Sequence, residues 1–353
     1  MRTIGNWPLQ VRNASLPGVN KFLIGLSALL LVCDPLRSAT NHLQKSATPG
    51  SPPAGTNDLA EEEYEKLTEE DDKAQAEVDQ WIRDNNEFTA KGAGVPAADL
   101  NRRIKERFEP VRNAYEDFLK RHPDHVKAHL AFGSFLGDMH DEEGARIHWQ
   151  KAIELDPKNP AAYNNMADLF THDGSITNAF AYYEKAIQLN PKESLYYHNL
   201  GTVVYLFRKD AMQYYGIAEQ RVFDKALELD SKALKLDPTN FPLATETAQT
   251  YYGVKPLRVE DALKAWTNTL SIAHDEIERE GVYLHLARIK LAAGRFAEAR
   301  AHVKTVTNEM YTELKGRLVR NLEKQEAEAK GTNAAPATVP GTNAAAPADK
   351  LKP

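Results

Sequence analysis

The same spacing of two alanines and a proline recurs three times along this chain. The second alanine follows the first by seven positions, and the proline comes five positions later. The three sets are Ala145, Ala152 and Pro157, then Ala179, Ala186 and Pro191, and finally Ala226, Ala233 and Pro238. The first two sets lie 34 residues apart, and helix-compatible sequence with this period indicates stacked helical hairpins. Such a stack builds a surface for binding, and nothing in its basic design performs chemistry.

Residues 160–193 show what one unit contains. Its first helix is predicted by large and small apolar residues at positions i, i+3, i+4 and i+7, namely Tyr163, Met166, Ala167 and Phe170. Gly174 supplies the turn, because glycine ends a helix at little steric cost. The second helix carries Ala186 and stops before Pro191, since proline removes a backbone donor and disfavours helix in the preceding residue. The alanines mark close approach of two helices, so the pattern is one of packing.

These residues resemble the tetratricopeptide repeat, a pattern of a bulky residue, Leu-Gly, an aromatic, a turn glycine, Ala, an aromatic, Ala and Pro. Five predicted units follow from the resemblance, at residues 126–159, 160–193, 194–240, 241–279 and 280–313. Upstream, Tyr115, Phe118 and Pro123 look like the second helix of an earlier, degenerate unit. The resemblance covers residues 100–315 and implies an all-α fold, a right-handed superhelical solenoid of stacked helical hairpins.

Two units depart from this pattern, the fourth by only two extra residues between Ala248 and Ala262. The interval from Gly201 to Ala226 is 25 residues, against 12 from Gly133 to Ala145, so the third unit carries 13 extra residues. This insertion, residues 205–224, is rich in aromatic residues: Tyr205, Phe207, Tyr214, Tyr215 and Phe223. Either the two helices lengthen and cover their own apolar stripe, or the extension projects as a docking surface, since insertions in repeat arrays tend to lie on one face.

The N-terminal residues 1–39 are predicted to be a signal peptide or a membrane anchor. An apolar run at residues 22–33 follows Arg2, Arg12 and Lys21, which is typical of the apolar region of a secretory signal and short for a bilayer span. Three outcomes remain open: cleavage before Cys33 with lipidation of that cysteine, ordinary cleavage near Ser38, or an uncleaved anchor. Each predicts an exported protein of the periplasm or the bacterial cell envelope.

The remaining segments flank the predicted array. Residues 40–57 are predicted to be a flexible linker, and residues 331–353 a disordered low-complexity tail. Residues 58–99 are predicted to form an acidic amphipathic helix, with a loop at 88–99; Asp71 interrupts its apolar seam. This helix either leans on the array or forms part of a coiled coil. A long charged helix over 305–330, carrying Met310 and Leu322, is expected to cap the last repeat through its part at 316–330.

Charge and cysteine content exclude several classes of function. The chain has 44 Lys plus Arg against 50 Asp plus Glu, for a net charge of −6, and no basic stripe with interleaved aromatics, so a nucleic-acid partner is not expected. Cys33 is the one cysteine, which excludes internal disulfides and cysteine-based metal clusters.

One histidine-rich stretch invites a metal hypothesis. Residues 122–129 contain His122, Asp124, His125 and His129, and the last two histidines are spaced to share a helix face. However, Pro123 lies at a boundary between repeats, and His129 takes the bulky packing position of the next helix. We therefore predict packing roles, no metal and no cofactor. Since the common catalytic motifs are also missing from the sequence, the prediction is a protein that is not an enzyme.

The resemblance also implies where a partner would bind, because the first helices of such hairpins line a concave groove. The candidate groove residues come from three successive units: Asn164, Asn165 and Asp168, then His198, Asn199 and Thr202, then Thr245, Glu246 and Gln249. Asparagine can both donate to and accept from the backbone of an extended peptide, as at this repeat position in some relatives. With the inserted Tyr214 and Tyr215, these residues form the predicted partner site.

Two functions follow as hypotheses. The first is an exported interaction scaffold that binds a protein or peptide partner in the groove. The second is a structural envelope component that associates with further copies of itself through the acidic helix or the terminal repeats.

Overall fold

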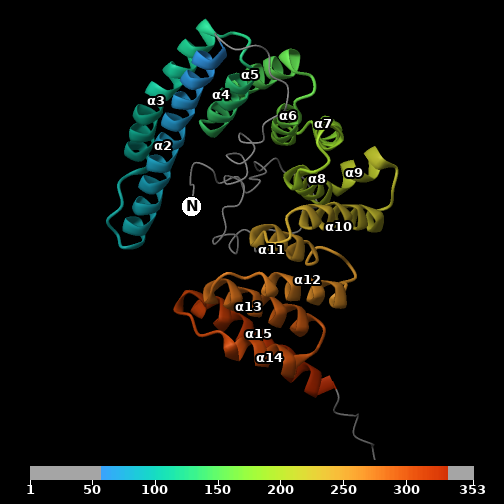
Figure 1. Cartoon of the computed structure of the whole chain (residues 1–353). Coiled ribbons are helices and arrows are strands. Elements are labelled where there is room, and N and C mark those ends of the chain that lie inside the picture. Colours follow the sequence, from blue (N-terminus) through green and yellow to red (C-terminus); the bar gives the residue numbers. More distant parts are fainter. Residues whose placement is uncertain (1–56, 333–353) are drawn as a thin grey trace, which may run out of the picture. The chain divides into compact units, whose positions relative to one another are not determined.

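The computed structural model describes residues 57–332, and these fold into α-helices joined by short connections (Figure 1). No strand occurs within this range. The chain divides into two compact units, one ending at Leu257 and one beginning at Arg258, which are described separately. The predicted all-α fold of stacked helical hairpins is confirmed. Cys33 and the apolar run at 22–33 lie outside the described residues.

The first unit contains helices α2 to α11. Their bounds are α2 (Asn57–Ala90), α3 (Ala97–Arg121), α4 (Val126–Asp138), α5 (Glu142–Leu155), α6 (Pro160–His172), α7 (Ile176–Leu189), α8 (Ser194–Leu206), α9 (Arg208–Tyr215), α10 (Glu219–Leu236) and α11 (Phe241–Thr250). Helices α4 and α5, α6 and α7, and α8 and α10 pack as hairpins. The first helix of each hairpin therefore comes from the segment where the repeat pattern predicts it.

The second unit contains the remaining helices. They are α12 (Val259–Ser271), α13 (Glu276–Ala292), α14 (Phe296–Thr305), the short 3-10 helix η1 (Glu309–Tyr311) and α15 (Thr312–Thr332). The predicted continuous helix over 305–330 is wrong in its first part, because α14 ends at Thr305 and η1 intervenes before α15. Met310 is 60% exposed, whereas Leu322 is buried against residues of α13 and α14. Within the described range, no helix has the length and apolar content required to span a bilayer.

Local sequence signals set the ends of the hairpin helices. Asn159 caps α6, since its side chain accepts from the backbone N–H groups of Ala161 and Ala162, and Pro160 occupies the first helical turn. Gly174 lies in the turn between α6 and α7 with φ of +83°, a conformation that other residues adopt at a cost. Helix α7 then ends at Leu189, two residues before Pro191.

The repeated small residues lie where helices approach most closely. Both alanines of all three sets are 0% exposed: Ala145, Ala152, Ala179, Ala186, Ala226 and Ala233. At Gly133 of α4, an added Cβ would come within 2.5 Å of the Trp149 Nε1 atom of α5. The helix spacing of each hairpin therefore depends on these side chains being small.

We expect Ala186→Leu to lower the free energy of unfolding by about 1–3 kcal/mol, because the added carbons overpack a closed helix contact. Chemical denaturation of the purified protein measures this change. Ala181→Leu is the matched control, since Ala181 lies on the same helix and is exposed. Equal stability of the two variants would contradict the packing position assigned to Ala186.

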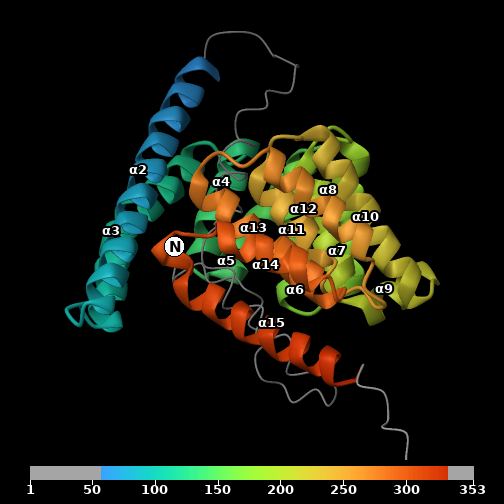
Figure 2. The same ribbon diagram turned by 90° about the horizontal axis from the view of Figure 1, so that it is seen from below.

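Helix α2 packs along α3, and the two run side by side in both ribbon views (Figures 1 and 2). The helix continues to Ala90 and α3 begins at Ala97, so the predicted loop at 88–99 is too long and the true connection is residues 91–96. One face of α2 is buried, through Tyr64, Leu67, Ala74, Val78 and Ile82. Of the two alternatives for this helix, the structure has the one in which it leans on the array.

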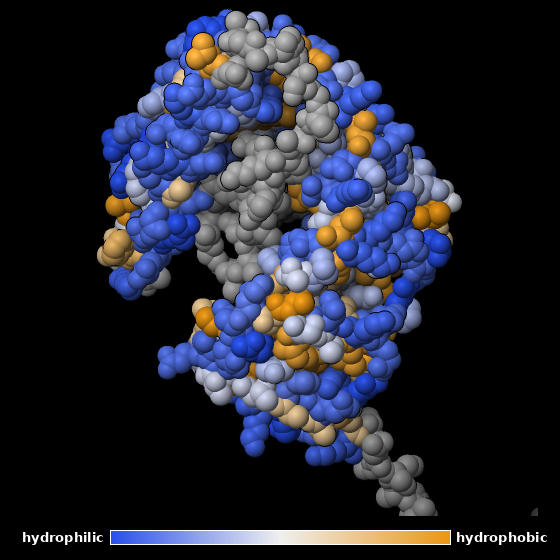
Figure 3. Space-filling model, viewed as in Figure 1, coloured by the Kyte–Doolittle hydropathy of each residue, from blue (hydrophilic) through white to orange (hydrophobic). Residues whose placement is uncertain are grey.

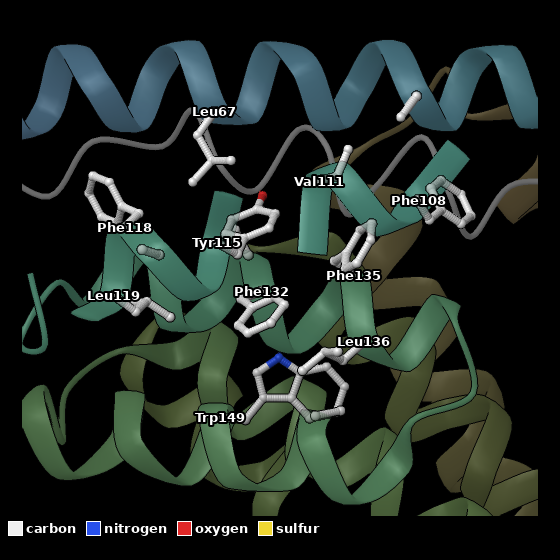
Figure 4. Packing of buried hydrophobic residues seen from close by; sticks show 14 of the residues in the cluster. Leu67, Phe108, Val111, Tyr115, Phe118, Leu119, Phe132, Phe135, Leu136 and Trp149 are labelled. Carbon is white, nitrogen blue, oxygen red and sulfur yellow. The ribbon is translucent and has the colours of Figure 1, made fainter. Parts of the chain in front are cut away.

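Asp71 does more than interrupt the apolar seam of α2. It is 6% exposed and accepts hydrogen bonds from the Tyr115 hydroxyl (2.8 Å) and from Gln75 Nε2 (2.7 Å). Figure 4 shows the Tyr115 hydroxyl pointing from α3 toward α2, beside Leu67 and Phe118. Burial raises the pKa of Asp71 to about 6. Helix α2 thus provides the first-helix partner of the degenerate unit whose second helix carries Tyr115 and Phe118.

Candidate protein-interaction face

The first helices α4, α6, α8 and α11 present one row of side chains at the same repeat position. The row is Ser134, Asp168, Thr202 and Gln249, and its members follow one another by 34, 34 and 47 residues. Each of the four is half-buried, so each keeps some contact with solvent. We refer to this row as the first-helix face. A stack of hairpins repeats a surface position once per unit, and here that position is polar throughout.

Polar side chains also connect each first helix to the next. Asn165 of α6 lies 3.3 Å from the Ser134 hydroxyl of α4. Asn199 Nδ2 of α8 donates to Asn164 Oδ1 of α6 at 3.0 Å. His198 Nε2 of α8 lies 2.6 Å from Glu246 Oε2 of α11. These three contacts form a polar ladder that joins the four helices.

The structure gives the candidate asparagines a different setting from the predicted one. Asn164 is 2% exposed and Asn199 is 7% exposed, and their amides bond to each other. Asn165 is half-buried, and its amide is satisfied when Oδ1 accepts from Trp149 Nε1 and Nδ2 donates to the Ala161 carbonyl, both at 3.2 Å. These amides are thus engaged in contacts within the stack, whereas Asp168, Thr202 and Gln249 keep some contact with solvent.

Asp168 occupies an unusual position for a carboxyl group. The Tyr183 hydroxyl of α7 donates to its Oδ1 atom, and Asn164 Nδ2 lies 3.4 Å from its Oδ2 atom. Both partners are neutral. Burial raises the pKa of Asp168 to about 7, and the hydrogen bond from Tyr183 opposes that rise only in part.

His198 lies between two carboxylates. Its Nδ1 atom is 3.4 Å from Asp230 Oδ1, and its Nε2 atom contacts Glu246. Asp230 is 3% exposed and sits where α8 and α10 approach closely, so that a Cβ on Gly201 would come within 2.8 Å of its Oδ1 atom. Burial acts to lower the pKa of His198, but the hydrogen bonds and charges of Asp230 and Glu246 outweigh it and raise the pKa to about 10. His198 is therefore an imidazolium at neutral pH.

Thr245, the remaining groove candidate, is half-buried on α11. Its hydroxyl is enclosed and has no hydrogen-bond partner among residues 57–332. Because the Thr245 hydroxyl is enclosed, a ligand beside Gln249 could not reach it.

The inserted aromatic residues fold back onto the second helices. The insertion forms the separate helix α9 and lengthens α10. The rings of Tyr214 and Tyr215 lie 5.2 and 5.5 Å from the Phe180 ring of α7, and Lys225 Nζ of α10 lies 4.0 Å from the Tyr215 ring centroid. The contacts described for both tyrosines are thus with α7 and α10, and the structure does not bring them together with the first-helix face.

The histidines of residues 122–129 have separate structural roles. His125 caps α4, because its Nδ1 atom accepts from the Ala128 N–H, and its Nε2 atom lies 3.5 Å from Glu61. His129 is 7% exposed, with its Nδ1 atom 2.9 Å from His148 Nδ1 and its Nε2 atom 2.9 Å from the Pro123 carbonyl oxygen. Within the described part of the chain, no group of three or more His, Cys, Asp or Glu side chains could hold a metal ion.

One segment of the chain matches a known repeat family in sequence. Residues 148–180, from the middle of α5 to the beginning of α7, match the tetratricopeptide repeat family. The chain therefore contains a tetratricopeptide repeat. The match spans one boundary between hairpins, and the same alanine and proline positions recur in the hairpins on either side of it. No curated protein matches the chain in sequence.

Several solved structures of tetratricopeptide-repeat and related proteins are similar to this chain. MamA is 25% identical, with 50% of this chain and 95% of that chain covered and a TM-score of 0.39. PilF of Pseudomonas aeruginosa is 17% identical, with 72% and 99% covered and a TM-score of 0.46. PilW, described as a type IV pilus biogenesis factor, is 15% identical, with 69% and 97% covered and a TM-score of 0.47.

Proposed function

We propose that this tetratricopeptide-repeat protein is a non-enzymatic interaction scaffold that binds an extended peptide or protein segment on its first-helix face. The observation that carries the proposal is the row of Ser134, Asp168, Thr202 and Gln249, one half-buried polar side chain per hairpin. An extended segment offers a backbone amide and carbonyl at each residue, so a row of regularly placed polar groups suits it. The polar ladder beneath the row keeps the four helices in a fixed relation, which reduces the ordering cost of binding.

The test uses a display library of short random peptides selected on the purified full-length protein. We expect Thr202→Ala and Gln249→Ala to weaken binding of the selected peptides by about 1–2 kcal/mol each, because both side chains belong to the first-helix face and keep contact with solvent. Isothermal titration measures the loss, and circular dichroism checks that the helices persist. Gln150→Ala is the control, since Gln150 is exposed on the second helix α5. Loss of affinity in the control alone would place the binding surface elsewhere.

Self-association is the second candidate function, and the end of the α2–α3 hairpin favours it. Phe88 and Val95 are each 53% exposed there, and Figure 3 shows apolar residues at this end of the molecule. Val95 N donates to Asn85 Oδ1 at 2.7 Å, so the exposed side chain is held on an ordered connection. A concentration-dependent mass in sedimentation equilibrium, together with no selected peptide, would support self-association over peptide binding.

We further propose that the chain is exported to the periplasm or the cell envelope of a bacterium. Support comes from Arg2, Arg12 and Lys21 ahead of the apolar run at 22–33. We expect mass spectrometry of protein expressed in a bacterium to find one of three products: a start after this run, a lipid-modified Cys33 in the membrane fraction, or an uncleaved chain in the membrane fraction. An unmodified chain beginning at Met1 in the cytoplasmic fraction would contradict export.

A further inference from the structure

Asp168 of α6, Asp230 of α10 and Glu246 of α11 are carboxyl groups close to the polar ladder. The fold places a cation beside only two of them. Asp230 and Glu246 both face His198, at 3.4 and 2.6 Å. Asp168 instead has the Tyr183 hydroxyl and the Asn164 amide as its hydrogen-bond partners. Among the described residues, no Lys, Arg or His forms an ion pair with it. The two carboxylate environments on this set of helices therefore differ in whether a cation is present.

The charged surroundings of Asp168 do not compensate for its burial. From α7, the titratable group that faces it is Tyr183. On its own helix, His172 follows one turn later, and burial lowers the pKa of that histidine to about 4, so it is neutral at pH 7. For residues 57–332, no charged side chain of α4, α5 or α8 contributes a charge that shifts Asp168. A carboxylate that is partly withdrawn from water without a cation is costly, and an arriving cation would recover part of that cost.

Because Asp168 lies on the first-helix face, a partner bound to that face can supply the cation that the fold does not. Ser134, Thr202 and Gln249, the other three members of the row, are neutral. We propose that Asp168 receives a lysine or arginine side chain of the bound segment, so that the partner is an extended chain with one basic residue among neutral polar ones. This inference rests on the proposed function and adds to it the chemical class of the ligand.

Binding of a basic side chain at Asp168 depends on pH. A basic side chain pairs with the ionised form of Asp168, so binding must remove the proton that burial favours. With a pKa of about 7, roughly one molecule in ten is ionised at pH 6 and nine in ten at pH 8. Affinity for a lysine-containing segment is therefore expected to rise about tenfold from pH 6 to pH 8.

The experiment compares matched peptides on the full-length protein and its variants. Peptides selected from the random library are resynthesised with their central Lys or Arg changed to Gln, and dissociation constants are measured at pH 6 and pH 8. For the natural protein at pH 8, we expect the Gln peptides to bind at least about tenfold more weakly. For Asp168→Asn, we expect both the preference and the pH dependence to disappear. Asp210→Asn is the control for net charge, since Asp210 is exposed on α9.

The outcomes separate the two proposals. Selected peptides that bind the first-helix face but lack a basic residue, or that keep their lysine preference on Asp168→Asn, would overturn the role of Asp168 and leave the interaction scaffold intact. Failure of every peptide in the library to bind the natural protein would overturn peptide binding on this face, and the role of Asp168 with it. Circular dichroism and thermal unfolding of Asp168→Asn show whether the variant is folded.

Discussion

His198→Ala is expected to lower the free energy of unfolding by about 3–5 kcal/mol at pH 7, because it leaves two carboxylates without their shared cation. Asp230 is 3% exposed, so water replaces the imidazolium poorly. Glu246 is less enclosed, with about a third of its side chain accessible (31%), so most of the loss comes from Asp230. The change also removes the contact that joins α8 to α11 in the polar ladder.

The pH dependence of stability identifies the imidazolium as the cause. The pKa of His198 is about 10 in the folded protein, against an ordinary value of 6.5 when unfolded. The folded state therefore holds a proton that the unfolded state releases, and this stability is fully present below pH 6.5 and lost as pH rises toward 10. Denaturation at pH 6, 8 and 9.5 should show this loss in the natural protein and not in His198→Ala.

Two further variants complete the measurement. His172→Ala removes a histidine of α6 that is neutral at pH 7, and it should cost much less stability than His198→Ala, because no carboxylate loses a cation. Adding Asp230→Asn to His198→Ala should recover part of the lost stability, because the buried charge goes with the cation. If His198→Ala costs no more than His172→Ala, then His198 does not carry the charge assigned to it.

The sequence predicts the hairpins well because their packing depends on residue size and on helix ends. Ala186 and Gly133 show this, since a larger side chain at either position would overlap the facing helix. The pattern of small residues can be recognised from the sequence alone. Pro191 and Gly174 mark turns by backbone chemistry alone. Local rules of this kind transfer directly from sequence to fold.

The polar contacts between elements were much less predictable. Asp71 looks like a break in an apolar seam, and only the position of Tyr115 on another helix turns it into a buried hydrogen bond. Asn199 has the residue type and repeat position expected of a peptide-binding residue, but its amide donates to Asn164 of the preceding unit. In each case the meaning of a polar residue depends on a partner more than 30 positions away in the chain.

The arrangement of the insertion at residues 205–224 is only partly predictable from sequence, for the same reason. A separate helix α9 places Tyr214 and Tyr215 over Phe180 of α7, and neither a simple lengthening of two helices nor a free projection describes that arrangement. The aromatic content predicts packing, but the surface against which it packs is set by the helix that precedes it in the stack. A weak signal was present, because Gly216 ends α9 in a left-handed conformation.

Asp168→Asn is expected to stabilise the protein above pH 7, by up to about 4 kcal/mol. The pKa of Asp168 is about 7 in the folded state and 3.8 as an ordinary aspartate, so between pH 4 and pH 7 the folded state binds a proton that the unfolded state lacks. Stability of the natural protein therefore falls as pH rises through this window, at about 1.4 kcal/mol per pH unit at most. The amide of the variant can still accept from Tyr183 and carries no charge to desolvate.

Denaturation of both proteins at pH 4, 6 and 8 measures the effect. The two stabilities should be closest at pH 4, and the advantage of the variant should grow through pH 6 to pH 8. This window lies below that of His198, so the two groups can be separated within one pH series. Equal pH dependence in the natural protein and Asp168→Asn would show that Asp168 is ionised without cost. A carboxyl group that weakens the fold at neutral pH, and whose loss removes recognition of a basic side chain, is what a stability–function trade-off at a binding site requires.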